Sequence, residues 1–212
     1  MTKRLFAAAS AFLALTTAAP AQNSIQDIAK SVGGRAGDIA QAEELLRSPD
    51  RNQRIAAMEA LLNSKDPAFI QVAKEAGLTS SDPTMRAAAA RAILDAGGNF
   101  VAELLIPPED KDQTQVFRWL EGAGRSWSSD RRVGFYNFAV GPYNETKQCW
   151  VFLGSDACAL SMSGESVSTG YWRYGNLMGH SIMSLDETGA LTGAFVVAGR
   201  GTPVTIRIPL LN

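Results

Sequence analysis

Two fifteen-residue stretches, Ser48–Leu62 (SPDRNQRIAAMEALL) and Ser80–Leu94 (SSDPTMRAAAARAIL), decide how the first half of the chain folds. They align at an offset of 32 residues. Each carries an aspartate near its start, Asp50 or Asp82, which can accept hydrogen bonds from the free backbone N–H groups of a first helical turn. Apolar residues of the first copy recur at the spacing of one helix face: Ile55, Met58 and Leu62. The two stretches therefore predict two equivalent amphipathic helices.

Further helices are predicted around these copies. Asp66-Pro67 can cap and open a helix between them, because proline suits the first helical position. Gly77 is expected to end that helix. Upstream, we expect two short helices, at roughly 25–32 and 38–47, which would close one end of the helical segment.

The pattern S-x-D-x-x-x-R-x-A-A-x-x-A-L, shared by the two copies, resembles HEAT-type helical repeats over residues 38–98. The resemblance implies a stacked helical array that binds other proteins or docks a neighbouring domain. It also implies that Arg54 and Arg86 are structural, bonding to the preceding turn or to an aspartate of a neighbouring repeat. About three repeats are needed to bury such a core, and the sequence shows two. We therefore expect the second half of the chain to pack against the uncovered end of the helical array.

Composition changes near Gly97-Gly98, because every tryptophan and tyrosine lies beyond residue 100. Aromatic and β-branched residues between glycine-containing turns favour strands. Strands are expected at 133–139, 148–153, 157–162, 167–174, 178–185, 190–198 and 203–209. Residues 99–106 fit a helix or a strand. Residues 113–120 are also ambiguous between the two, although Asp112 could cap a short helix there. The sequence thus predicts an α+β protein: a HEAT-like array followed by an antiparallel β-sandwich or small barrel.

The N-terminal segment is typical of an export signal. Lys3 and Arg4 precede an apolar run of roughly 11 residues and the motif Ala19-Pro20-Ala21. We expect cleavage near Ala21, a helical domain at 22–98 and a β domain at 99–212, located in the periplasm or outside the cell. The apolar run is too short for a membrane span, so none is expected in the mature chain. A net charge of −1 gives no reason to expect nucleic acid as a partner.

The two cysteines, Cys149 and Cys158, are expected to form a disulfide across one hairpin, because an exported chain meets oxidising conditions. Eight intervening residues do not give the C-x-x-C spacing of a redox pair. The bridge is therefore predicted to be structural.

No catalytic residue, metal ligand or cofactor is predicted. His180 is the single histidine, and the chain has neither a G-x-S-x-G motif nor a metal-ligand spacing around it. A pair of carboxylates for glycan hydrolysis stays open, because its geometry is invisible in a sequence. Its candidates are Glu145, Asp156, Glu165, Asp186 and Glu187.

The candidate binding residues are aromatic and basic. They are Tyr171, Arg173, Trp127, Arg131, Tyr143 and His180. Trp150 and Trp172 are expected in the core. Exposed rings with arginine suit a protein partner or a sugar. We therefore expect a non-catalytic binding protein for a protein or cell-envelope component. The alternatives are a carbohydrate- or small-ligand-binding module, which a strip of exposed rings would favour and buried rings would disfavour, and an envelope hydrolase.

Overall fold

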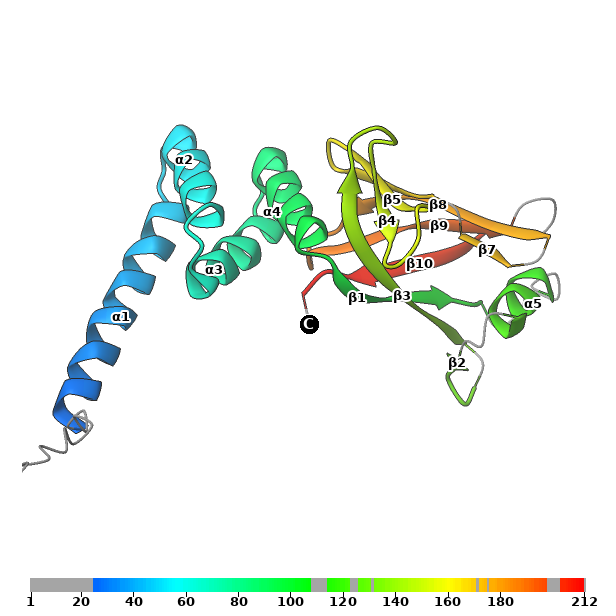
Figure 1. The fold of residues 1–212 in the computed structure, drawn as a ribbon, viewed down its shortest axis with the longest axis horizontal. Coiled ribbons are helices and arrows are strands. Elements are labelled where there is room, and N and C mark those ends of the chain that lie inside the picture. Colours follow the sequence, from blue (N-terminus) through cyan, green and yellow to red (C-terminus); the bar gives the residue numbers. More distant parts are fainter. Residues whose placement is uncertain are drawn as a thin grey trace, which may run out of the picture. The chain divides into compact units, whose positions relative to one another are not determined.

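Helices come first along the chain and most strands follow (Figure 1). The computed structural model describes residues 25–107, 114–122, 126–130, 132–170, 172–174, 176–197 and 203–211. The predicted export signal lies outside these ranges. Helices and strands are both abundant within them, so the α+β class is confirmed. The described chain separates into two compact units, residues 25–37 and the part from Asp38 onward.

Four helices open the described chain, with the bounds α1 Ile25–Leu46, α2 Arg51–Leu62, α3 Pro67–Leu78 and α4 Pro83–Ala96. The predicted caps are confirmed. The side chain of Asp50 accepts from the backbone N–H of Asn52 at 2.8 Å, and Asp82 accepts from that of Thr84 at 2.9 Å. None of the helices in the described ranges is both long enough and apolar enough to cross a membrane.

The two arginines of the repeated motif make the same contact in both copies. Arg54 donates to the carbonyl of Ser48 at 2.8 Å, and Arg86 donates to that of Ser80 at 2.7 Å. The expected contact with the preceding turn is confirmed at both positions. Each bond ties a helix to the turn before it, so the 32-residue offset in sequence is also a repeat in local structure.

Two helical predictions were wrong. The segments 25–32 and 38–47 form one continuous helix, α1, because Gly33, Gly34 and Gly37 cost only about 1 kcal/mol each in a helix that no proline interrupts. Gly77 does not end α3 but lies buried in its last turn. A Cβ there would collide with Met58 and Ala89, so glycine serves the close approach of neighbouring helices.

Eight antiparallel strands close into a barrel, in the order β1-β10-β9-β8-β6-β5-β4-β3 and back to β1. Two more strands pair outside this ring, β2 with β3 and β7 with β8. Of the two predicted architectures, the barrel is therefore correct. The bounds are β1 Gly98–Leu105, β2 Ser126–Trp127, β3 Val133–Asn144, β4 Cys149–Phe152, β5 Cys158–Ser163, β6 Ser166–Thr169, β7 Trp172–Tyr174, β8 Leu177–Leu185, β9 Ala190–Val197 and β10 Val204–Pro209.

The two ambiguous segments are now assigned: residues 99–106 mostly form β1, and a short helix, α5 (Thr114–Gly122), covers 114–120. The predicted strand 167–174 is two strands, β6 and β7. Gly170 separates them, and its N–H donates to the carbonyl of Ala159 at 2.8 Å. A Cβ at Gly170 would collide with the backbone of Cys158 on β5, which explains why a glycine stands between β6 and β7.

Aromatic rings fill the interior of the barrel. Trp119 of α5 stacks on Trp172 of β7 with ring centroids 6.2 Å apart, and Phe138 and Phe195 pack against Trp172. The indole N–H of Trp172 donates to the carbonyl of Ala159 at 2.8 Å, so its burial leaves no polar group unsatisfied. The expected core positions of Trp150 and Trp172 are confirmed, since both are fully buried.

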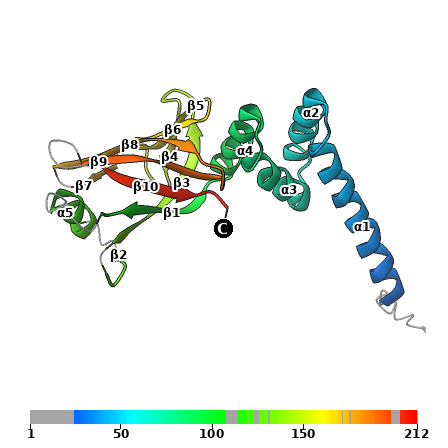
Figure 2. The same ribbon diagram turned by 180° about the vertical axis from the view of Figure 1, so that it is seen from behind.

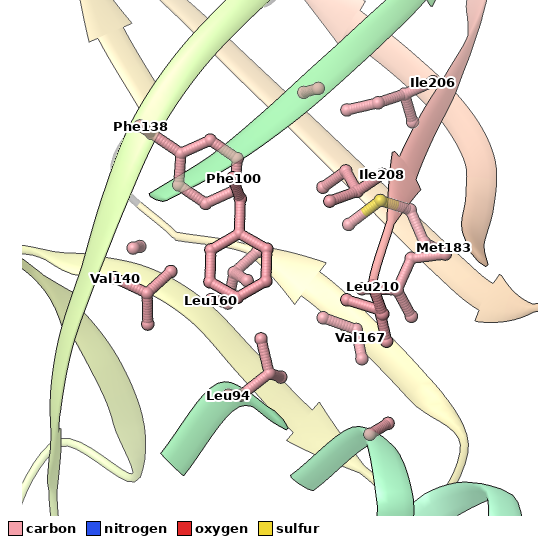
Figure 3. Packing of buried hydrophobic residues seen from close by; sticks show 14 of the residues in the cluster. Leu94, Phe100, Phe138, Val140, Leu160, Val167, Met183, Ile206, Ile208 and Leu210 are labelled. Atoms are coloured by element: carbon pink, nitrogen blue, oxygen red, sulfur yellow. The ribbon is translucent and has the colours of Figure 1, made fainter. Parts of the chain in front are cut away.

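Both ends of the barrel are covered. In both views α5 lies at one end and α4 at the other (Figures 1 and 2). Leu94 of α4 points towards the apolar side chains of the strands, among them Phe100 and Leu160 (Figure 3). Polar contacts reinforce this junction, because Asp95 accepts from the indole N–H of Trp150 at 2.9 Å and Arg86 pairs with Glu165. Helices α2 to α4 therefore share one hydrophobic core with the barrel.

Candidate functional site

Two predicted binding residues lie near α5. Trp127 of β2 is half-buried and packs edge-on against Phe117, with ring centroids 5.5 Å apart. Arg173 of β7 is exposed. Both strands lie at the α5 end of the barrel (Figure 1). Tyr171 and Arg131 lie outside the described residues, so their predicted role stays a prediction.

Tyr143 lies at the other end of the barrel. The guanidinium of Arg91, on α4, stands 4.9 Å from the centre of the Tyr143 ring, and Trp150 packs edge-on at 5.0 Å. Trp127 pairs with Gly134, which is nine positions before Tyr143 on β3. At about 3.3 Å per residue, this separates Trp127 from Tyr143 by up to about 30 Å. Of the predicted binding residues that the structure describes, Trp127 and Tyr143 therefore do not lie in one patch.

His180 is exposed on the outer face of β8, opposite Val196. Among the described residues, no group of three or more histidine, cysteine or acidic side chains could hold a metal. Asp186, one of the candidate carboxylates, accepts from Thr188, Ala190 and Thr192 within its own turn. Partial burial acts to raise the pKa of Asp186, but these hydrogen bonds outweigh it and hold the pKa below its usual value.

The predicted disulfide is confirmed. Cys149 of β4 and Cys158 of β5 are bonded, with Cα atoms 5.7 Å apart. The bridge anchors the β4–β5 hairpin. Lys147, just before β4, reaches across the hairpin to the carboxylate of Asp156 at 3.0 Å, and this ammonium holds the pKa of Asp156 below its usual value.

A groove of about 670 Å³ crosses the outer face of the barrel beside this hairpin. We call it the outer-face groove. It is lined by Tyr143, Lys147, Gln148, Ser161, Met162, Ser163, Ser166, Ser168 and Ile182. No carboxylate lines it, and its one charged group, the ammonium of Lys147, is already paired with Asp156.

Strand register explains why serines collect there. Ser161 of β5 pairs with Ser168 of β6, and Ser168 pairs in turn with Ile182 of β8. Directly paired residues of neighbouring strands point to the same face of a sheet. Ser163 and Ser166 form a second such row, which continues to Ser184. The result is a field of hydroxyl groups, each able to donate and accept a hydrogen bond.

Ile182 differs from these serines, because it is a large apolar side chain with 72% of its surface exposed. The residues beside it on β8, Ser181 and Met183, are buried. Ile182 pairs with Ser168 of β6 on one side and with Ala194 of β9 on the other, so hydroxyl groups border this apolar side chain on the β6 side. An exposed apolar residue beside polar groups is a composition found at protein–protein interfaces.

A second hollow, of about 690 Å³, lies where the α3–α4 turn meets the β8–β9 turn. Its main charged groups already have partners within the fold. Arg86 bonds Glu165 and the carbonyl of Ser80, and Asp186 is held in its own turn. We interpret this hollow as part of the helix–barrel junction.

The outer-face groove was missed in the sequence, except for Tyr143. A usable signal was present, because Ser166 and Ser168 alternate with the buried Val167, and Ser161 follows the buried Leu160. The predicted strands 157–162 and 167–174 leave out Ser163 and Ser166, and only the register across three strands shows that these serines share a face with Ile182. Comparisons with protein-family models, with curated proteins and with solved structures found no match to this chain.

Proposed function

We propose that this is an exported, non-catalytic binding protein that engages a protein partner of the cell envelope through the outer-face groove. The exposure of Ile182 within a hydroxyl-lined surface is the observation that carries this proposal. Periplasmic or extracellular location is part of it, and the Cys149–Cys158 disulfide is compatible with that location.

The filled barrel supports binding on the outside. Small-ligand sites are usually concave cavities of several hundred cubic ångströms lined by apolar groups. Here Trp119, Trp172 and Phe195 occupy the barrel interior. A partner would therefore contact the wall of the barrel, where Ile182 is accessible.

The helices, in this proposal, form a short HEAT-like array that braces the barrel. The equivalent contacts of Arg54 and Arg86 with their preceding turns support the resemblance. The repeats are also linked, because Arg51 of the first copy pairs with Asp82 of the second at 2.7 Å. Arrays of this kind dock neighbouring domains or bind proteins, and here α4 packs on the barrel.

A glycan is the second candidate ligand, and the hydroxyl lining of the groove favours it. The buried state of Trp150 and Trp172 counts against a platform of stacked rings. The hydrolase alternative has less support, since Asp156 is paired with Lys147 and Glu165 with Arg86.

Site-specific photo-crosslinking tests the proposal. A photoreactive analogue of phenylalanine replaces Ile182 in one variant and Leu153 in another. Leu153 is a matched control, because it is 66% exposed and lies outside the groove lining. In intact cells, we expect a discrete crosslinked protein species from position 182 and none from position 153. Ser168→Val, next to Ile182, should reduce the crosslink at least threefold.

The opposite result is equally clear. Equal crosslinks at both positions, or none at either, would contradict a partner protein at the groove. A glycan array that gives a hit abolished by Ser168→Val, with no protein crosslink, would replace the proposal by the glycan alternative.

A further inference from the structure

Gln148, one of the residues that line the outer-face groove, has an unusual backbone conformation. Its φ angle is 52°, in the left-handed region that glycine adopts readily and most other residues avoid. In the described ranges, the one other non-glycine residue with a positive φ is Lys65, in the α2–α3 turn, with a φ angle of 61°. Glycine would adopt this conformation without the steric cost, so the presence of a glutamine side chain at the groove calls for a reason.

Both neighbours of Gln148 are anchored to the other end of the β4–β5 hairpin. The ammonium of Lys147 donates to the carboxylate of Asp156 at 3.0 Å. On the other side, Cys149 is bonded to Cys158. A left-handed conformation at a residue other than glycine persists where the surrounding structure imposes it. These two links therefore hold the backbone of Gln148 in place beside the groove.

The side chain of Gln148 is exposed, and no hydrogen bond joins its amide to another residue of the described chain. An amide side chain can donate two hydrogen bonds and also accept them. Because the backbone that carries it is already fixed, that backbone loses no freedom when a ligand binds. Gln148 thus offers hydrogen-bonding groups to the groove that the fold itself does not use.

We propose that Gln148 contacts the partner directly, and that the part of the partner in the groove is an extended peptide segment. This inference rests on the proposed function of the groove. The amide of Gln148 can donate to a peptide carbonyl and accept from a peptide N–H, so it matches a polypeptide backbone. Ile182 offers an apolar contact to a side chain of the same segment. The serine hydroxyls of the groove can bond the peptide groups between these two contacts.

The dimensions of the groove agree with an extended segment. Strands β4, β5, β6 and β8 are neighbours in this order, Gln148 directly precedes β4, and Ile182 lies on β8. Three strand spacings of about 4.8 Å separate the two residues by about 14 Å, measured across the strands. A fully extended chain covers about 3.4 Å per residue, so about four residues reach from Gln148 to Ile182.

Substitution by glycine tests the role of Gln148, because it removes the side chain and relieves the backbone. Lys65→Gly is the matched control, since Lys65 is also left-handed but lies outside the groove lining. In urea unfolding, both variants should have the same midpoint as the wild type or a higher one. In chains with the photoreactive residue at position 182, the crosslink should fall at least threefold in Gln148→Gly and stay unchanged in Lys65→Gly.

Three results would count against this role. A lower unfolding midpoint for Gln148→Gly would show that the glutamine serves the turn, and would overturn the proposal. An unchanged crosslink in Gln148→Gly would overturn this inference alone and leave the proposed function standing. If position 182 gave no crosslink even without the glycine substitution, the proposed function would fail, and this inference would fail with it.

The peptide class is tested separately, with a phage-displayed library of short linear peptides selected on the purified protein. We expect to recover peptides whose affinity falls at least fivefold in Gln148→Gly and stays the same in Lys65→Gly. A selection without such peptides would overturn the peptide class. A glycan-array hit that Gln148→Gly abolished would replace the peptide by a sugar as the ligand of this amide.

Discussion

A single carboxylate, that of Asp82, joins the two helical copies. It caps α4 by accepting from the backbone of Thr84, and it pairs with Arg51 of α2 at 2.7 Å. Asp50 caps α2 in the same way but pairs with no arginine among the described residues. Two aspartates at equivalent positions therefore differ in one respect, the link to the neighbouring copy.

This difference predicts a pH dependence. Desolvation acts to raise the pKa of Asp82, but hydrogen bonds from Arg51 and Thr84 outweigh it and lower the pKa below its usual value. A group whose pKa is lower in the folded state stabilises the fold above its unfolded pKa, near 3.9, and this contribution is lost as the pH falls through the folded pKa. In urea unfolding, Asp82→Asn should therefore lose less stability than the wild type between pH 7 and pH 3. Arg51→Gln, which removes the partner and keeps Asp82, should flatten the profile in the same direction, and a profile as steep as that of the wild type in both variants would contradict this role of Arg51.

At the scale of elements, local sequence signals such as capping aspartates were sufficient to predict helices and strands. Asp50 and Asp82 correctly marked helix starts, and the strand predicted at 203–209 is β10, in which the alternating residues Val204, Ile206 and Ile208 are buried. Glycine was the weak signal. Gly77 was expected to end a helix. Instead it lets α3 approach both α2, at Met58, and α4, at Ala89, and only the folded structure brings these two residues to it.

Substitution of glycine by alanine separates these roles. Gly77→Ala should destabilise the fold by about 1–3 kcal/mol, the usual cost of overpacking, although alanine is the better helix former. Gly34→Ala is the matched control, because a Cβ there meets nothing within 4 Å in α1. We expect it to leave the free energy of unfolding unchanged or to raise it slightly. Thermal and urea unfolding measure both, and equal effects would show that close packing at Gly77 is unimportant.

For the whole molecule, the sequence indicated which residues could bind a partner, but it did not indicate which of them lie close together in the fold. The sequence identified Tyr143, Trp127 and Arg173 as candidates, but the length of β3 separates Tyr143 from Trp127. The groove residues Ser168 and Ile182 were missed because they are brought together by pairing of β6 with β8. Such pairings join distant parts of the chain, so the sequence of a single strand does not show which strand it pairs with.

The shared core gives a prediction at this scale. Trp172 is fully buried among Trp119, Phe138 and Phe195, so Trp172→Ala should lower the free energy of unfolding by about 3–5 kcal/mol. Trp127→Ala, at a half-buried ring, should cost clearly less. Urea unfolding followed by circular dichroism gives both values. A smaller loss for Trp172→Ala than for Trp127→Ala would contradict the central place of Trp172.

Closure of the barrel also governs how the protein reaches its native state. The ring is sealed where β1 pairs with β10, and the Glu103–Arg207 contact across that seam joins residues 104 positions apart. The chain must therefore lose the entropy of a long loop before the β1–β10 hydrogen bonds can offset that loss. This requirement slows folding relative to a helical repeat of equal length. Until that moment both β1 and β10 present open strand edges, which are templates for pairing with other chains. The interval before the seam closes is thus the period in which this protein is most exposed to aggregation.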